Sequence, residues 1–472
     1  MHDPAEEDAP DDDIVVPDRD ARQIVHPTVE HVHGPEEVAY EADELIVLCL
    51  VRDGRPYVRS FVEHYSSMGV KHLVFLDNGS IDGTVEVLTE YDNVTVLRTE
   101  LPYRGNHGLM LRYLVERFGQ GRWSLCVDID ELFDYPYSDV VGLGSLLRYL
   151  NSNSYTAVVA HMLDMFPEKP LSGRAGNLDE PLKELHRFYD ISDLRRKNIE
   201  EHPRCPPDNT YGRDDIAAFS GGVRLSAFGV NTFLTKHPLV FMDGKVKPVI
   251  GPHWCSNARV ADFTGVLLHY KFLDEYLQKQ AEKAVREEHR KVKGTAWYKT
   301  ILEALDRPAG LSITTDASRE LKSVNDLVGT QFVSVSRQYM RFVESEVQRN
   351  ADHSEGRWSE ILFEALFNAQ AEVTSLAEQV ETMREQNRTL RRVPNQAEMR
   401  KLRRQLEQMR RELEQARREF EKVQRLRRGE AEDIRQLNRE LTAIKSSRGW
   451  KITNGINVAL IKARSIFKGG RS

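Results

Sequence analysis

Short apolar runs that end in polar turns alternate with helix-like segments over the first third of the chain. The runs ELIVLCLVRDG (residues 44–54) and KHLVFLDNGSIDGT (71–84) have the length and apolar character of strands buried on both faces. Between them, residues 56–69 place apolar side chains at helical spacing and stop at Gly69, and a second helix is expected from Thr84. This order predicts an α/β fold with a parallel sheet and a ligand crevice at the carboxyl ends of its strands.

The stretch WSLCVDIDELF, residues 123–133, brings acidic side chains to the end of a strand-like apolar run. Alternation along a strand places Asp128 and Asp130 on the same side. Two carboxylates in that position repel each other unless a hard divalent cation lies between them. The pattern therefore predicts a metal clamp for a phosphate-bearing ligand. The alternative is a solvated turn after a core strand, and these residues alone leave both open.

Three motifs in order make a family resemblance specific. The series LVRDGRPYVRSFVEHYSSMGVKHLVFLDNGSIDGT, followed by WSLCVDIDELF, resembles the nucleotide-sugar-binding half of GT-A glycosyltransferases, most closely the family-2-like and family-92-like enzymes. In these enzymes a helix of the E-H-Y…G-V-K-H kind precedes D-N-x-S-x-D-G-T, and a Trp leads into D-x-D-E-F. The resemblance is strong over residues 44–135 and weak over 136–345. It implies a GT-A (Rossmann-like) domain at 44–345 that uses Mn²⁺ or Mg²⁺ and a UDP- or GDP-sugar.

The resemblance also implies roles for single residues near the nucleotide. Asp53 and Asp77 are expected at the base or ribose, where a carboxylate at a strand end accepts hydrogen bonds. For Asp77 the alternative is a turn aspartate that caps its own backbone. Asp82 is interpreted as a turn or helix-capping residue. Arg104, in the loop 102–108, is a candidate for the diphosphate because a guanidinium suits phosphate oxygens, although a surface arginine fits equally well.

The late strand GVLLHYKF, residues 265–272, resembles the GT-A strand whose histidine completes the metal shell. His269 is therefore the third expected metal ligand beside Asp128 and Asp130, with a core or hydrogen-bonded histidine as the alternative. Asp128 is also expected to contact the nucleotide sugar. Lys271, two residues further on, is a weaker candidate for contact with the leaving diphosphate.

The catalytic base is harder to place. An inverting transferase needs a carboxylate to take the proton of the acceptor hydroxyl, and Asp164, Asp214 and Asp215 are the acids available before the Gly221–Gly222 turn. The family often keeps its base near such a Gly-Gly segment, but here Val223 and Arg224 follow it. We select Asp215 as the predicted base, and this departure leaves both the base and inversion open.

The amino-terminal segment is more acidic than the rest of the chain. The 472-residue chain carries a net charge of −7, and residues 1–43 hold a run of Asp and Glu with several prolines and few basic residues. Such a segment cannot bury a core, so a disordered acidic tail is predicted. It lacks the pattern of a secretory signal, and no segment approaches the ~20 apolar residues that span a bilayer. Four cysteines in this length imply no disulfide framework, which favours a reducing, cytoplasmic location.

The sequence of the carboxyl-terminal part indicates self-association and surface binding, and it holds no candidate catalytic residue. Residues 365–445 repeat apolar side chains every three or four positions between Glu, Gln and Arg, which is typical of a coiled coil, with Pro394 as an interruption. We interpret it as a stalk for self-association, the alternative being a single long helix. Residues 446–472 are basic and amphipathic and suit a helix lying on an anionic bilayer, with a partner-binding helix as the competing interpretation.

Together these features predict a metal-dependent glycosyltransferase of hexosyltransferase type, peripheral on the inner face of the cell membrane. Its acceptor is expected to be a hydroxyl of a glycan or lipid-linked glycan in cell-surface polysaccharide synthesis, and no nucleic-acid partner is expected. The alternative from another class is a noncatalytic coiled-coil scaffold built on a degenerate transferase domain. Intact Asp77, Asp128 and Asp130 argue against the scaffold, whereas the unplaced base keeps it open.

Overall fold

A computed structural model describes most of the first of the two units into which the chain divides. The described residues are 20–171, 181–202, 205–213, 216–248, 254–273, 277–278, 281–282, 296–306 and 310–351, with isolated positions at 407, 408, 411 and 418. Contacts divide the chain into two units, Met1–Val347 and Gln348–Ser472, and the first of them holds almost all of the described residues. The predicted base Asp215 lies outside the described residues, as do most of the predicted coiled coil and the whole basic tail.

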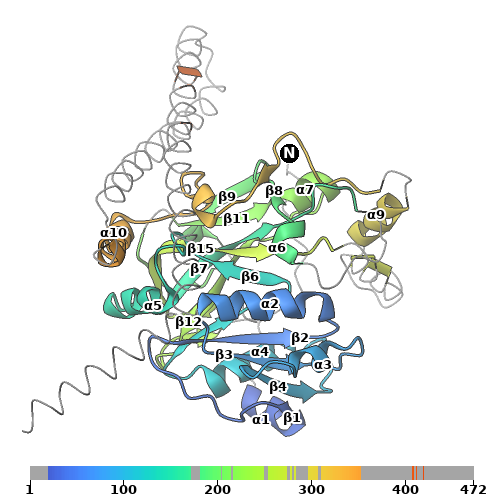
Figure 1. The fold of residues 1–472 in the computed structure, drawn as a ribbon, viewed down its shortest axis with the longest axis vertical. Coiled ribbons are helices and arrows are strands. Elements are labelled where there is room, and N and C mark those ends of the chain that lie inside the picture. The colour runs from blue at the N-terminus through green and yellow to red at the C-terminus, as the bar shows by residue number, and fades with distance from the viewer. Residues whose placement is uncertain are drawn as a thin grey trace, which may run out of the picture. The chain divides into compact units, whose positions relative to one another are not determined.

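The first unit is an α/β structure built on one large mixed sheet. Ten of the described strands form this sheet in the order β1-β4-β3-β2-β5-β12-β7-β15-β10, with β6 paired to β15. In Figure 1 these strands are stacked in this order from β1 near the bottom upward to β15. The predicted α/β class with parallel strands is confirmed, because β2, β3, β4 and β5 are parallel neighbours. Their bounds are Leu45–Val51, His72–Asp77, Val94–Thr99 and Trp123–Cys126.

The helices that connect these strands follow the sequence pattern. Helix α2 (Arg55–Met68) buries the apolar face of Val58, Phe61 and Tyr65 and ends at Gly69, whose φ of 91° is left-handed, as the prediction required. Helices α3 (Thr84–Leu88) and α4 (His107–Phe118) follow β3 and β4. Asp82 has the capping role expected of it, because its carboxylate accepts the backbone N–H groups of Arg55 and Thr84 at the starts of α2 and α3.

The second half of the sheet is mixed. Strand β12 (Thr235–Phe241) is antiparallel to both β5 and β7 (Ala157–Asp164), and β7 is parallel to β15 (Arg259–His269). Strand β6 (Glu131–Asp134) is antiparallel to β15, and β10 (Thr210–Tyr211) pairs with β15 in parallel. This arrangement brings the ends of β6, β7 and β15 together beside the carboxyl end of β5.

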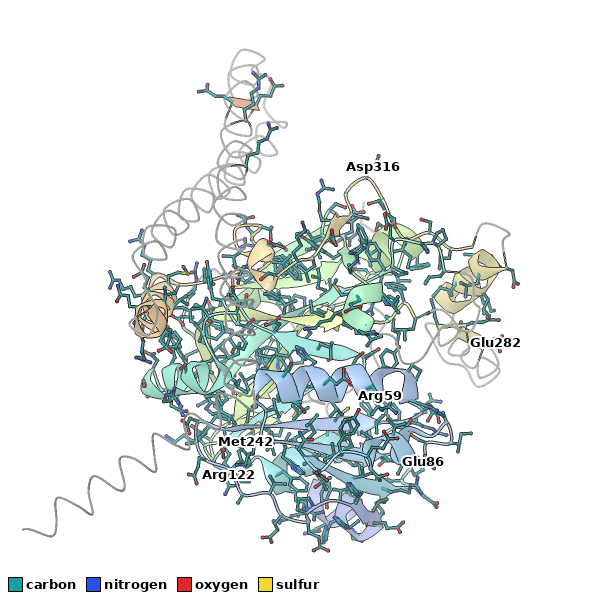
Figure 2. The ribbon with its side chains drawn as sticks, in the orientation of Figure 1. Arg59, Glu86, Arg122, Met242, Glu282 and Asp316 are labelled. Atoms are coloured by element: carbon teal, nitrogen blue, oxygen red, sulfur yellow. The ribbon has the colours of Figure 1, made fainter. Side chains whose placement is uncertain are left out.

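The remaining elements surround the sheet. The buried apolar side chains include one cluster that contains residues of the sheet strands and another whose buried members lie outside those strands. Figure 2 draws the side chains of the described residues. The other elements are α5 (Leu143–Ser152), α6 (Leu182–Leu185), β8 (Phe188–Tyr189), β9 (Leu194–Asn198), η2 (Ile199–Glu201), β11 (Ala217–Gly221), α7 (Val223–Phe228), β13 (Lys247–Pro248), β14 (Cys255–Ser256), α9 (Ala296–Leu305), β16 (Arg319–Glu320), η5 (Val324–Leu327) and α10 (Arg337–Ala351).

Residues 20–43 correct the predicted boundary of the domain, because they belong to the fold rather than to a disordered tail. Asp20 caps α1 (Ala21–Val25), η1 (His26–Thr28) follows, and β1 (Val29–His33) pairs antiparallel with β4. Tyr40 is also buried, with the Arg122 guanidinium 4.6 Å from the centre of its ring; Arg122 is labelled in Figure 2. The acidic composition of residues 1–43 as a whole concealed these few apolar anchors.

Membrane spans and disulfides were both expected to be absent. Within the described ranges, no helix combines the length and the apolar character needed to cross a bilayer. All four cysteines are buried free thiols.

Candidate functional site

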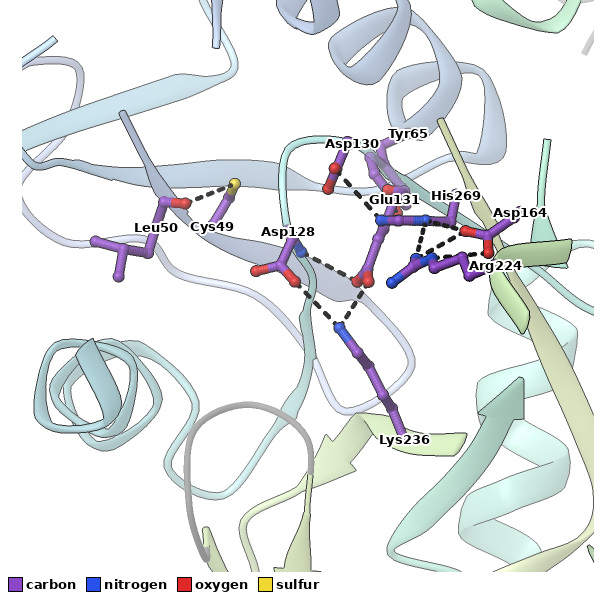
Figure 3. A network of polar contacts seen from close by, with 10 residues as sticks. All are labelled: Cys49, Leu50, Tyr65, Asp128, Asp130, Glu131, Asp164, Arg224, Lys236 and His269. Carbon is purple, nitrogen blue, oxygen red and sulfur yellow. Dashed lines mark hydrogen bonds and ion pairs between the residues drawn. The ribbon is translucent and has the colours of Figure 1, made fainter. Parts of the chain in front are cut away.

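The acidic motif lies in a turn and not on a strand. Strand β5 ends at Cys126, and the Glu131 N–H donates to the Asp128 carbonyl at 3.0 Å before β6 begins. Asp128 and Asp130 therefore do not occupy alternating positions of one strand. Their side chains point to different partners, Lys236 and His269, as Figure 3 shows. The expectation that alternation brings the two carboxylates together is wrong, because the strand stops before it reaches either of them.

Lys236 is the partner of Asp128 and Glu131. Its Nζ lies 2.6 Å from Glu131 Oε1 and 3.1 Å from Asp128 Oδ2, and the Asp128 N–H donates to Glu131 Oε2 at 3.2 Å. The side chains of Lys236 and Glu131 are buried. Burial acts to lower the pKa of Lys236, but Asp128 and Glu131 outweigh it and raise that pKa above its ordinary value. Burial likewise raises the pKa of Glu131, while the Lys236 ammonium acts to lower it, and at 2.6 Å the two side chains form an ion pair.

A register shift explains how Lys236 reaches the turn. The pairing of β12 with β7 is irregular between Lys236 and Leu239, around Pro238, which has no N–H to give to the ladder. A bulge of this kind redirects a side chain from its place in the alternation. Lys236 lies in β12, opposite Ala160 and next to this irregularity, and its side chain reaches the acidic turn.

Strand register also assembles the second group of contacts. His269, the last residue of β15, is opposite Glu131 on one neighbouring strand and Asp164 on the other. Its Nδ1 lies 2.6 Å from Asp164 Oδ1, and its Nε2 lies 3.4 Å from Asp130 Oδ2. Both carboxylates and the imidazole are largely withdrawn from solvent.

Arg224 completes this second group. The guanidinium donates from Nε and Nη2 to the two oxygens of Asp164 at 2.9 and 2.8 Å, a bidentate pair, and Nη2 lies 2.9 Å from His269 Nδ1. Arg224 is the second residue of α7, and this helix begins directly after Gly221 and Gly222. The chain Arg224, Asp164, His269, Asp130 thus links α7 to the acidic turn (Figure 3).

The pKa values in this group shift in the directions that the contacts require. Burial acts to raise the pKa of both Asp164 and Asp130. Arg224 and His269 nevertheless hold the pKa of Asp164 well below its ordinary value. His269 does the same for the pKa of Asp130. Burial acts to lower the pKa of His269, and the two carboxylates outweigh it and raise that pKa. The two carboxylates beside the ring therefore favour its protonated form.

The two aspartates predicted near the nucleotide hold the turns in which they lie. Asp77, at the end of β3, is buried and accepts the backbone N–H groups of Gly79 and Ser80 and Arg98 Nε at 3.1 Å. Asp53, with a left-handed φ of 52°, accepts the N–H of Ile81 at 3.0 Å. These contacts match the turn-capping alternative for Asp77. They also place both residues at the carboxyl ends of neighbouring strands β2 and β3.

The predicted cationic residues lie around this edge. Arg104 is exposed in the turn between β4 and α4. Lys271 lies two residues beyond the end of β15, and its charge helps to lower the pKa of Asp130. Lys271 is thus close enough to influence the acidic turn, although it is not on the strand.

The donor atoms of the site decide whether a divalent ion fits it. Among the described residues, no three side chains of His, Cys, Asp or Glu form a group that could hold a metal ion. Asp130 Oδ2 and His269 Nε2 do form a usable pair at 3.4 Å, since two ligands at right angles and about 2.1 Å from a small ion lie about 3 Å apart. In the neutral ring, Asp164 on Nδ1 selects the tautomer that exposes Nε2, so an ion would bind here only with loss of a proton from His269. Of the three predicted ligands, Asp130 and His269 lie beside each other, while Lys236 engages Asp128.

Three site residues were not recognised in the sequence as contributors: Lys236, Arg224 and Arg98. The signal for Lys236 was a charged residue inside the apolar run FLTKHPLVFM (233–242). Arg224 was noted only as the residue that stands where an acid was expected, and Asp164 only as a possible base. No protein-family model matches the chain, and neither does any curated protein.

Proposed function

We propose that the chain is a metal-dependent glycosyltransferase with a GT-A domain, as its motifs suggest. The observation that carries the proposal is the pair formed by Asp130 and His269, backed by Asp164, beside the carboxyl ends of the parallel strands. Crevices at this edge of an α/β sheet are the usual place for nucleotides. The large mixed sheet is compatible with a Rossmann-like nucleotide-binding domain.

In this proposal the chain's own residues bind and orient the reactants. The turns held by Asp53 and Asp77 shape the nucleotide pocket, with Arg98 bound to Asp77 at the same edge. Asp130 and His269 would hold Mn²⁺ or Mg²⁺, which acts as a Lewis acid on the leaving diphosphate. Lys271 and Arg104 are the cations proposed for the diphosphate oxygens.

We assign to Asp215 the removal of the proton from the acceptor hydroxyl. Asp164 is unsuited to this role because Arg224 and His269 engage both of its oxygens and keep its pKa low. A group whose conjugate acid is that strong is a weak base. Deprotonation by Asp215 of an acceptor hydroxyl on a glycan or lipid-linked glycan would support an inverting transfer.

The wider setting belongs to the same proposal. We propose a UDP- or GDP-sugar as donor and synthesis of a cell-surface polysaccharide as the process. The predicted coiled coil would provide self-association, and the basic tail would bring the enzyme to the cytoplasmic face of an anionic membrane.

The noncatalytic scaffold remains the second candidate, and one observation favours it. Lys236, a cation of the chain itself, forms ion pairs with both Asp128 and Glu131, as in a structural ion-pair network. A scaffold of this kind would keep the sheet and its ion pairs without any turnover of donor.

The test of the proposed function is release of nucleoside diphosphate from a panel of UDP- and GDP-sugars in Mn²⁺. We expect one donor to be hydrolysed, with the rate lost in Asp130→Asn. Asp43→Asn, which alters an exposed ion pair with Arg148, is the matched control and should retain the rate. Absence of release from every donor, with and without candidate acceptors, would favour the scaffold.

A further inference from the structure

Residues 6–13 carry six acidic side chains that the proposed function does not use: Glu6, Glu7, Asp8, Asp11, Asp12 and Asp13. No lysine or arginine occurs in the first 18 residues of the sequence. Residues 1–19 lie outside the described residues, and the described chain begins at Asp20, which caps α1. Runs of like charge often serve as interaction segments, so a cationic surface within reach of Asp20 is a candidate partner.

Exposed cations gather at the carboxyl ends of β2, β3 and β4. We call this surface the arginine edge and define it by Arg52, Arg55, Arg98 and Arg104. The Arg52 and Arg98 side chains are 50% and 36% exposed. The aspartates of the same turns accept backbone N–H groups, which take up part of their charge: Asp53, Asp77 and Asp82. Glu30 and Glu100 are exposed acids beside the edge, and the four arginines outnumber them.

Two of these arginines retain donors for a further carboxylate. Arg98 Nε donates to Asp77 at 3.1 Å, which uses one of the five N–H groups of its guanidinium. Arg52 Nε lies 3.8 Å from Asp53 Oδ2, beyond hydrogen-bond distance. A guanidinium binds a carboxylate through two parallel N–H···O bonds. The arginine edge therefore fits an anionic peptide segment.

The fold brings the start of the described chain close to the same edge. Strand β1 pairs antiparallel with β4, and Thr28 Oγ1 lies 2.7 Å from Thr99 Oγ1, next to Arg98. Helix α1 and η1 separate Thr28 from Asp20 by at most about 14 Å. Residues 14–19 span up to about 20 Å when extended. The acidic run of residues 6–13 can therefore reach Arg98 within its own chain.

We propose that the acidic run of residues 6–13 binds the arginine edge and has to leave it before a nucleoside diphosphate binds there. Its carboxylates compete with phosphate oxygens for the same guanidinium groups. Such competition weakens the apparent affinity for the nucleotide in proportion to the fraction of time for which the edge is free. The competition rests on the proposed function, whereas the contact between the acidic run and the edge does not.

The contact is measured with a nitroxide label on Ala9→Cys in the full chain. The four native cysteines are buried, so the label attaches to the new one. In low salt, where the Debye length is about 20 Å, we expect the electron paramagnetic resonance spectrum of a slowed label. In about 0.5 M salt, where the Debye length is about 4 Å, we expect the spectrum of a mobile label.

Substitutions at the edge decide whether the slowing comes from this contact. Arg52→Gln/Arg104→Gln removes two of the cations, keeps the pair of Arg98 with Asp77, and should mobilise the label even in low salt. The matched control is Arg148→Gln/Arg187→Gln, which removes two exposed arginines on other elements and should leave the label slowed.

Two results would overturn the contact. One is a label that is equally mobile in low and high salt, or that stays slowed in Arg52→Gln/Arg104→Gln. The other is slowing that is lost on dilution, which would place the acidic run on a second copy of the chain.

Nucleotide binding separates this inference from the proposed function. Saturating UDP or GDP with Mn²⁺ should mobilise the label in low salt. Replacing the six acids of the run by their amides should tighten nucleotide binding, followed by calorimetry, at least about twofold, the factor expected if the run occupies the edge half of the time. A nucleotide that binds without mobilising the label overturns the competition and leaves the proposed function standing. If neither nucleotide binds with Mn²⁺, the proposed function and the competition fail, while the response of the label to salt and to the arginine variants still decides the contact.

Discussion

Replacement of Asp164 by asparagine tests the ion network that links α7 to the acidic turn. The carboxylate is nearly buried and holds Arg224 at 2.8 Å and His269 at 2.6 Å, while the Arg224 Nη2 and His269 Nδ1 atoms are themselves 2.9 Å apart. Asp164→Asn keeps a hydrogen-bond acceptor and the volume but removes the charge between two cations. The variant therefore places like charges in contact in a poorly solvated region.

The expected magnitude follows from the burial of the network. Removing one partner of a buried ion pair costs about 3–5 kcal/mol, and the retained acceptor favours the lower end, about 3 kcal/mol. Relief is available by loss of the His269 proton. Urea unfolding of the wild type and the variant, followed by far-ultraviolet circular dichroism, measures the difference in the free energy of unfolding.

The same variant predicts a pH dependence with a definite sign. The folded pKa of His269 is raised above its ordinary value of 6.5, so its interactions stabilise the wild type fully below that value and are lost as pH rises through the folded pKa. Because Asp164→Asn removes one of the two carboxylates responsible, the loss of stability should be larger near about pH 5.5 than near about pH 9.

Asp43→Asn removes the same charge from the exposed pair with Arg148 and should cost less than about 1 kcal/mol at either pH. A difference below about 1 kcal/mol for Asp164→Asn, or a difference that is the same at both pH values, would refute this role of the network.

Three further substitutions test other parts of the fold and the site by denaturant unfolding. Val25→Ala removes two buried methyl groups from α1 and should cost about 2 kcal/mol, whereas no cost would mean that residues 20–43 do not stabilise the domain. Gly222→Ala places a side chain at φ 69° and ψ −156°, a backbone region open almost only to glycine, and should lower the free energy of unfolding by about 1–3 kcal/mol. We also expect it to displace α7 and so weaken nucleotide binding. Unchanged stability would contradict this. Tyr65→Phe leaves the Glu131 carbonyl without its donor and the Phe133 N–H without its acceptor and should cost about 2 kcal/mol, while a neutral result would show that this hydroxyl does not hold the turn.

Much of the parallel half of the sheet is predictable from the sequence because its signals are local. The apolar runs that become β2 and β3, the spacing in α2 and the stop at Gly69 each depend on residues close together in the chain. The pairing of β12 between β5 and β7 has no such signal, since its partners lie about a hundred residues away and any of several strands has the right composition. The boundary at residue 44 was wrong because a few anchors, such as Val25 and Tyr40, stabilise a segment whose average composition is acidic.

The candidate site divides in the same way. Asp128, Asp130 and His269 were recognised as residues, and the structure does bring Asp130 and His269 together. What no local pattern could give is the partner of each acid. Lys236, which contacts the turn, is more than a hundred residues away in the chain and lies next to an irregular pairing of β12. Arg224 binds the Asp164 carboxylate, which makes Asp164 unsuitable as a base.

The measurement that tests the proposed donor site most directly is calorimetric titration of UDP and GDP into the purified protein, with and without Mn²⁺. We predict that one nucleotide binds in the presence of Mn²⁺ and that this binding is lost in Asp130→Ala. Absence of binding of either nucleotide under any metal condition, or binding that persists unchanged in Asp130→Ala without Mn²⁺, would contradict the proposed site.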